Sequence, residues 1–335
     1  MRAAWRYPVL LVLLGGLAAL LFAASLLTGP SGAGAAEGLA ALFAPAPDQE
    51  ALALVMREIR LPRALLGLTV GVSLGLAGAV LQGFLRNPLA EPGLIGVSGA
   101  AAFGAVLAFY TGLAGMAALA LPAMALAGAV LAVALVFAIA GRHGGSLTVI
   151  LAGIAVSSLA GALVSLTLNL SPNPFAAYEI MFWLLGSLAD RSMQHVALAV
   201  PFMAAGWLLL ALTARSLDAL TLGEDAAAAL GVRLARVRLL AVLGTALAVG
   251  AAVAVAGAIG FAGLVVPHLL RPLVGAEPSR LLPASALGGG ALLLAADLAV
   301  RLIAPDRDLK LGVVTALIGA PFFVWLVLKT RREAA

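Results

Sequence analysis

Long apolar runs separated by short polar breaks dominate the chain. A helix needs roughly 20 mostly apolar residues to cross ~30 Å of hydrocarbon, and most of the runs have about this length. They predict ten transmembrane helices, at about residues 8–28, 64–85, 93–110, 114–139, 147–168, 194–213, 237–258, 261–274, 283–303 and 311–328. No long soluble stretch interrupts them. The pattern therefore predicts an all-α polytopic membrane protein with one transmembrane domain, residues 1–335.

The eighth predicted helix differs from the others because it is short and contains Pro267 and Pro272. At membrane depth a short or broken helix persists only where neighbouring protein satisfies its backbone polar groups. We therefore expect this helix inside the bundle. The third and fourth helices are separated only by Thr111-Gly112-Leu113, which predicts a tight hairpin.

Composition narrows the functional classes. Apolar residues make up 63% of the 335 positions and charged residues only 10%, far from the balance of a soluble domain. The absence of cysteine excludes disulfides and thiolate metal sites. Lysine and arginine form no run interleaved with aromatic residues, so nucleic acid is not an expected partner. The first apolar run is longer than a signal-peptide core, so we expect it to be retained as a span.

Arginine and lysine indicate the orientation in the membrane. With a cytoplasmic N-terminus, 13 of the 20 basic residues fall on the inner side and 7 on the outer side. Cytoplasmic loops normally carry the excess of positive charge, so both termini are predicted inside. Arg57, Arg60 and Arg63 are exceptions, because they cluster on the outer side just before the second span. They are either anchors that snorkel at a helix end or functional residues.

Asp297 is the one clear carboxylate within the predicted spans, and His268 is the only other ionisable residue near a span interior. An intramembrane acid can belong to a proton relay. Ion-coupled carriers usually need several acids, or acids with histidine partners. We therefore favour a structural interpretation, in which Asp297 accepts hydrogen bonds from neighbouring helices.

Motifs for catalysis and nucleotide binding are absent from the sequence. It has no H-E-x-x-H, no G-x-S-x-G and no P-loop. Gly257, Gly260 and Gly263 lie in an Ala-rich apolar run, which is typical of close helix packing. We expect no enzyme activity and no cofactor bound by this chain, with any ATP hydrolysis on a separate polypeptide. An intramembrane hydrolase that uses Asp297 and His268 is a more distant alternative.

The cytoplasmic segment between the sixth and seventh spans contains a short predicted helix. Thr221 or Gly223 can begin it, Glu224 and Asp225 occupy its first turn, and Gly231 can end it. Its apolar residues are small, so another surface can approach closely. A helix lying on lipid would need a basic polar face, whereas this one is acidic. The segment therefore predicts contact with a cytoplasmic partner.

The polar break after the second span is unusually rich in proline and glycine, and it carries a family resemblance. It reads Arg86-Asn87-Pro88-Leu89-Ala90-Glu91-Pro92-Gly93-Leu94-Ile95-Gly96-Val97-Ser98-Gly99. Further matches follow in the same order, at Ile59-Arg60-Leu61-Pro62-Arg63, Leu222-Gly223-Glu224, Leu230-Gly231-Val232, residues 256–268, Leu282-Pro283 and residues 311–322. Nearly the whole chain thus resembles the BtuC/FecCD family of importer permeases, the membrane subunits of ATP-driven uptake systems for iron chelates, haem and cobalamin.

The resemblance implies a BtuC-like permease bundle in the bacterial inner membrane. It implies a homodimer around a central pathway, two copies of a cytoplasmic ABC ATPase and a periplasmic substrate-binding protein. The binding protein would dock on Arg60, Arg63 and Arg301. The region at about 217–232 would be the coupling helix seated in the ATPase, with contacts at Leu222, Gly223, Glu224, Asp225, Leu230 and Gly231. Asn87 and Ser146 align with the cytoplasmic gate region.

Two departures from the family pattern lie toward the outer side. Lys310 stands where the family usually has proline, and residues 169–192 match the cobalamin permease poorly. The sequence therefore leaves open whether the cargo is an iron-siderophore, haem or cobalamin. The expected function is import of a bulky metal chelate by ATP-driven alternating access. The alternative is a secondary transporter that works alone on an ion gradient.

Overall fold

The computed structural model describes residues 6–29, 34–43, 47–117, 119–141, 146–171, 174–304 and 309–334, and every regular element in those ranges is helical. Seven helical segments are long and apolar enough to cross a membrane: Tyr7–Leu27, Glu50–Phe84, Ala120–Ala140, Leu147–Asn169, Met193–Ala211, Leu234–Ala256 and Pro278–Ile303. Three shorter apolar segments are Val97–Tyr110, Ala262–Val274 and Leu311–Leu326. Each of these segments overlaps one predicted span, so the all-α membrane fold is confirmed.

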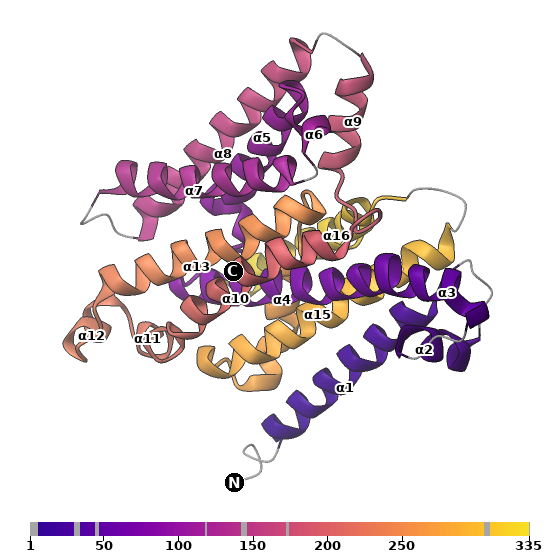
Figure 1. The fold of residues 1–335 in the computed structure, drawn as a ribbon. Helices are drawn as coiled ribbons and strands as arrows, with labels where there is room; N and C mark the ends of the chain where they lie inside the picture. Colours follow the sequence, from indigo (N-terminus) through magenta and orange to yellow (C-terminus); the bar gives the residue numbers. More distant parts are fainter. Residues whose placement is uncertain are drawn as a thin grey trace.

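Helix α4 (Leu61–Phe84) forms the centre of the bundle. It packs along α15 (Pro278–Ile303) and α13 (Leu234–Ala256), with α10 (Met193–Ala211) and α1 (Arg6–Leu27) farther out (Figure 1). The span that contains α4 is 78% buried, whereas the span of α1 is 17% buried. Glycines permit the close approach of α4 to α15. A Cβ on Gly71 would lie 2.8 Å from the Cα of Gly290, too close for any side chain.

A second group of helices packs against α13. It contains α5 (Val97–Tyr110), α7 (Ala120–Ala140), α8 (Ser146–Asn169) and α9 (Pro174–Leu184), which lie together at the top of Figure 1. Helix α16 (Leu311–Ala334) contacts both α14 (Ala262–Leu270) and α15. The chain therefore folds as one continuous bundle with α13 between its two groups.

Helix α14 is the short, proline-interrupted helix predicted to lie inside the bundle, and its first six residues are buried. Pro267 has no N–H, so the carbonyl of Gly263, four residues earlier, loses its helical hydrogen bond. Gln82 of α4 supplies a replacement, because its Nε2 donates to the carbonyls of Gly263 at 3.5 Å and Leu264 at 3.3 Å. The predicted burial is confirmed, together with its physical reason.

Several short helices were not predicted from the sequence. They are α2 (Ala35–Phe43), α3 (Glu50–Leu54), a π-helix (Val55–Arg60), α6 (Leu113–Met116), α9 and α11 (Ala214–Leu220). The tight hairpin predicted at residues 111–113 is wrong, because α5 ends at Tyr110, α6 follows it, and α7 begins only at Ala120. Such elements are too short for hydrophobic periodicity to distinguish them from loops. Residues 172 and 173 of the divergent segment lie outside the described residues.

Candidate functional sites at the two ends of the bundle

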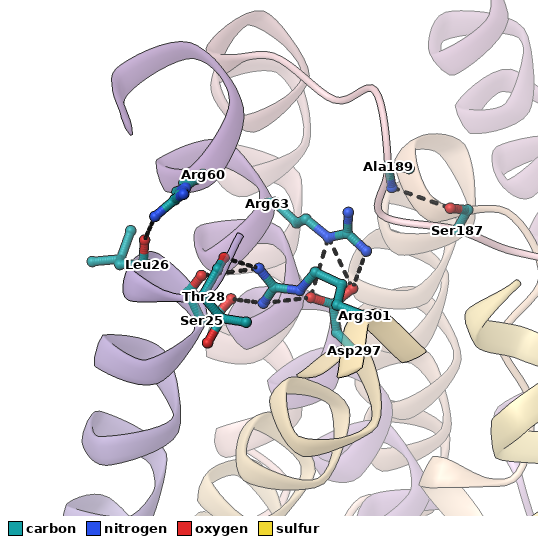
Figure 2. A network of polar contacts seen from close by, with 9 residues as sticks. All are labelled: Ser25, Leu26, Thr28, Arg60, Arg63, Ser187, Ala189, Asp297 and Arg301. Carbon is teal, nitrogen blue, oxygen red and sulfur yellow. Dashed lines mark hydrogen bonds and ion pairs between the residues drawn. The ribbon is translucent and has the colours of Figure 1, made fainter. Parts of the chain in front are cut away.

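Three arginines predicted to act together converge at one end of the bundle. Arg63, in the first turn of α4, reaches the carboxylate of Asp297 on α15 (Figure 2). Its Nε donates to Oδ1 at 3.0 Å and to Oδ2 at 3.2 Å, and its Nη2 donates to Oδ1 at 2.9 Å. This forked geometry is the strong form of an arginine–carboxylate pair.

Arg301 holds the other side of the same carboxylate. It lies four residues after Asp297, one helical turn away on the same face of α15, and its Nη2 is 3.1 Å from Oδ2. The guanidinium also reaches the end of α1. It donates to the carbonyls of Ser25 at 3.0 Å and Thr28 at 2.9 Å, and to Ser25 Oγ at 2.7 Å. Arg301 therefore ties α15 to α1.

Arg60 closes the cluster from the π-helix that precedes α4. Its side chain is buried, and Nη1 donates to the carbonyls of Leu26 and Leu27, each at 3.2 Å (Figure 2). These carbonyls belong to the last turn of α1, where helical partners are missing and a positive charge is favourable. Gly29 leaves the space for this contact, because a Cβ there would lie 2.7 Å from Arg60 Nη2.

The cluster of Arg60, Arg63, Asp297 and Arg301, hereafter the arginine network, has two positive charges in excess. Asp297 is almost completely buried, with 2% of its side chain exposed, while Arg63 is 20% and Arg301 14% exposed. Both η nitrogens of Arg301 have acceptors, whereas Nη1 of Arg63 has none among the residues that the structure describes. Arg63 is therefore the member that can still donate outward.

The arrangement also gives Asp297 its partners. The carboxylate accepts hydrogen bonds from Arg63 on the neighbouring helix α4, as the structural interpretation predicts, and it also pairs with Arg301 on its own helix α15. His268, the partner required by the hydrolase alternative, packs edge-on against Phe322 with ring centroids 5.7 Å apart. The carboxylate of Asp297 is thus occupied by two guanidinium groups.

The predicted coupling segment forms two short helices at the opposite end of α15. Helix α12 (Glu224–Ala229) begins after Gly223 and carries Glu224 and Asp225 in its first turn, as expected. Gly223 and Gly231 adopt φ of +105° and +85°, which a side chain disfavours, so glycine shapes both ends of α12. A second short helix, α11, was not predicted; it precedes α12 and anchors it.

The coupling segment has one part that is anchored to the bundle and one part that is exposed. Leu217 and Leu220 of α11 are buried, and Asp218 Oδ1 accepts the backbone N–H of Ser279 in the first turn of α15 at 2.8 Å. Leu222 and Leu230, which flank α12, are 68% and 66% exposed. The segment therefore holds firmly to the bundle while it presents two apolar side chains outward.

A hollow of about 830 Å³ separates α12 from the bundle. Leu85 and Arg86 at the end of α4, Leu147 and Ile150 in α8, and residues 222–226 line it. Each of the two predicted gate residues is next in the sequence to a residue that lines this hollow. Asn87 follows Arg86, and its Oδ1 accepts the N–H of Leu89 at 2.9 Å, while Ser146 is the first residue of α8. The structure thus brings the segments of both gate residues to one place.

The long apolar helices, packed into one bundle, are the architecture of a multi-pass membrane protein. Comparison with known proteins makes this specific. Residues 17–329 match the FecCD transport family, and the chain belongs to that family.

The similar proteins align with most of this chain. The cobalamin import system permease protein BtuC of Halobacterium salinarum is 42% identical over 83% of this chain and 74% of its own length. The Fe(3+) dicitrate transport system permease protein FecD of Escherichia coli is 39% identical over 83% and 86%. The solved structure of a metal-chelate type ABC transporter in an inward-facing conformation is 35% identical. It covers 96% of this chain and 99% of its own, with a TM-score of 0.85.

Proposed function

We propose that the chain is the transmembrane permease subunit of an ABC importer that moves a bulky metal chelate from the periplasm to the cytoplasm. The observation that carries the proposal is the placement of two different contact sites at opposite ends of one bundle. A cationic network lies at one end, and a glycine-bounded acidic helix projects at the other. Family membership supports the same class, since its members are transport subunits rather than enzymes.

The assembly that we propose is a homodimer in the bacterial inner membrane, with two cytoplasmic ABC ATPases and one periplasmic binding protein. The cargo is an iron-siderophore, haem or cobalamin. The names of the relatives, a cobalamin permease and an iron dicitrate permease, support this range. ATP binding and release on the ATPases would drive alternating access, and the chain itself would bind no cofactor.

We assign docking of the binding protein to the arginine network, in which the individual arginines have different roles. Arg63 keeps an open Nη1 and is the network's direct contact for a carboxylate on the partner. Arg60 and Arg301 use their guanidinium groups on the end of α1 and on Asp297, so they position Arg63 and raise the local positive potential. Charge of one sign on a docking face steers an acidic partner and fixes its register.

We assign the coupling between the permease and its ATPase to α12 and its flanking residues. Leu222 and Leu230 supply exposed apolar contact area, and Glu224 with Asp225 adds negative charge at the helix start. The adjacent hollow leaves room for α12 to approach the gate segments at Asn87 and Ser146 when an ATPase moves it. Leu222, Gly223, Glu224, Asp225, Leu230 and Gly231 are the residues to which we assign this contact.

Reconstitution tests the proposal directly. Proteoliposomes that contain the permease with its ATPase are loaded from outside with a labelled chelate and the binding protein. Uptake should require ATP at the ATPase face and the binding protein together, and an ATPase variant that cannot hydrolyse ATP should abolish it. Uptake by the permease alone under an imposed proton or sodium gradient would instead establish the ion-coupled secondary transporter.

A further inference from the structure

Helix α4 is followed by a residue with an unusual backbone conformation. Arg86, two positions after the last residue of the helix, has φ of +48°, in the left-handed region. Its N–H donates to the carbonyl of Gly83 at 3.3 Å, and the N–H of Asn87 donates to the carbonyl of Gln82 at 3.2 Å. These two bonds form a Schellman motif, whose left-handed position is usually occupied by glycine. An arginine thus stands where the backbone favours a residue without a Cβ.

The left-handed conformation of Arg86 makes its side chain informative. A Cβ in this region crowds the neighbouring carbonyl, so arginine makes the turn less stable than glycine would. Backbone strain of this kind gathers at functional sites, where the surrounding structure maintains it. The guanidinium of Arg86 is therefore a group for which a role should be sought.

The side chain of Arg86 reaches the start of α12. A Cβ built on Gly223, the residue before α12, would lie 3.8 Å from Nη1 of Arg86, which is van der Waals contact. Asp225 follows Gly223 by two residues, so its Cα lies within about 7 Å of that glycine's Cα. Arg86 and Asp225 are both exposed, and neither forms an ion pair among the residues that the structure describes. A cation and a carboxylate thus lie near each other without being joined.

Both groups line the hollow of about 830 Å³ between α12 and the bundle. One wall consists of the end of α4 and the start of α8, and Arg86 is its cation. The other wall consists of residues 222–226, with the carboxylates of Glu224 and Asp225, and the rest of the lining is apolar or glycine. Approach of the two walls would bury apolar surface and bring opposite charges together, and both effects are favourable.

The chain after Arg86 leads directly into the gate region. Asn87 is the next residue, and its Oδ1 accepts the N–H of Leu89. A few residues later, the carbonyl of Gly93 accepts a hydrogen bond at 3.1 Å from Ser157 Oγ on α8. Residues 87–96, hereafter the gate loop, therefore begin at Arg86 and are tied to α8 farther along. A displacement of Arg86 acts on this loop through one peptide bond.

We propose that Arg86 is a positioning residue that links α12 to the gate loop: when α12 approaches the bundle, the guanidinium pairs with the carboxylate of Asp225 and holds the hollow closed. The inference rests on the proposed function, because the ATPase is the partner that moves α12. The ion pair forms in the closed state only, so it changes the equilibrium between the two states. The strain at Arg86 is present in the open state, and its side chain acts in the closed one.

Cross-linking across the hollow tests the link without any cargo. The chain has no cysteine, so Leu147→Cys on α8 and Ala226→Cys on α12 place one thiol on each wall. A short bis-maleimide joins these thiols faster when the walls approach, and mass spectrometry measures the product in the complex of permease and ATPase. We expect the rate to differ between the nucleotide-free complex and the complex with a non-hydrolysable ATP analogue. Arg86→Gly should lower the faster of the two rates roughly threefold.

The same variant separates function from stability. Arg86→Gly relieves the left-handed strain and should raise the midpoint of thermal unfolding by about 2 °C, while uptake per ATP hydrolysed falls roughly threefold. Ala276→Gly is the matched control, because Ala276 is exposed with φ of +59° and carries no charge. It should raise the midpoint similarly and leave cross-linking and uptake unchanged.

Further variants at position 86 separate charge from backbone flexibility. Arg86→Asn tolerates the left-handed conformation without adding the flexibility of glycine, and it should show the same loss of uptake. Arg86→Lys keeps the charge and should retain most of the uptake. A fall in the unfolding midpoint of Arg86→Gly would overturn the inference, because the side chain would then stabilise the open state.

Charge exchange tests Asp225 as the partner of Arg86. Arg86→Glu and Asp225→Arg each place like charges on the two walls, and the double variant restores opposite charges. The double variant should therefore cross-link faster than either single variant. A double variant no faster than the single variants, or an Arg86→Gly variant with wild-type rates, would overturn the link.

These readouts also separate the link from the proposed function. Absence of ATP-driven uptake, together with cross-linking rates that depend on Arg86, would count against the proposed function alone. Intact uptake, together with rates that do not depend on Arg86, would count against the link alone.

Discussion

The two ends of the bundle are built on opposite principles. At the arginine network, charged side chains are buried and hydrogen-bonded to two other helices, so the groups assigned to docking also hold the fold together. At α12, glycine backbone conformations set the shape, and the exposed side chains touch little. The comparison teaches that a change at the first end should alter stability and function together. A change at the second should alter function with only a small loss of stability.

Removing the carboxylate of the arginine network should have the largest effect. Asp297→Ala leaves two guanidinium groups without their counter-charge, and breaking a buried pair in this way typically costs about 3 kcal/mol or more. We expect a large fall in thermal stability in detergent and loss of transport with it. Glu277→Ala is the control, because it removes a half-exposed pair with Arg280 and should cost about 0.5 kcal/mol or less. Equal stability of the two variants would contradict the buried-network description.

At the other end, Gly231→Trp should separate function from stability. Gly231 has no atom within 4 Å of a built Cβ, so a large side chain has room there and would enter the ATPase contact that we propose. We expect transport to fall by roughly tenfold or more while ATP hydrolysis continues. Thermal stability should fall only by the cost of a left-handed residue, about 1 kcal/mol.

Gly231→Asn is the matched control for that experiment. Asparagine tolerates the left-handed conformation and is small, so transport should remain close to wild type. Full ATP-driven uptake by the tryptophan variant would show that α12 does not contact the ATPase through this end.

Docking on the arginine network can be resolved one arginine at a time. Arg63→Gln should weaken binding of the periplasmic partner on the order of tenfold, because it removes the guanidinium whose Nη1 has no acceptor among the described residues. Raising the salt concentration should weaken wild-type docking more than docking of this variant. Arg57→Gln, an exposed arginine on the same side, removes equal charge outside the network and serves as the control. Equal docking by Arg63→Gln and Arg57→Gln would refute the assignment to Arg63.

The smallest expected effect tests the contact between Arg60 and the end of α1. Gly29→Ala places a Cβ 2.7 Å from Arg60 Nη2, and the side chain must shift away from the carbonyls that it caps. We expect a loss of about 1 kcal/mol in unfolding free energy. Gly34→Ala, where nothing lies within 4 Å, should be neutral. Equal stability of the two alanine variants would mean that the packing at Gly29 contributes nothing.

The long apolar helices and the buried, broken α14 could be predicted from the sequence. The length of an apolar run and the presence of proline are local features that can be recognised without knowing the fold. Sequence reasoning also placed both ends of α12, where glycine requirements are local as well. It missed the partners of Asp297. The spacing of four residues to Arg301 was visible in the sequence, but the pairing with Arg63 joins residues 234 positions apart and depends on how α4 packs on α15.

Helix α15 is one continuous helix that runs from the coupling segment to the arginine network. Its first turn receives Asp218 from the coupling segment at Ser279, and its last turns carry Asp297 and Arg301. At 1.5 Å per residue, its 26 residues span about 39 Å. Close glycine contacts hold it along α4, which carries Arg63 at one end and borders the hollow beside α12 at the other. The paired helices thus form a continuous packed connection between the two sites that contains no loop.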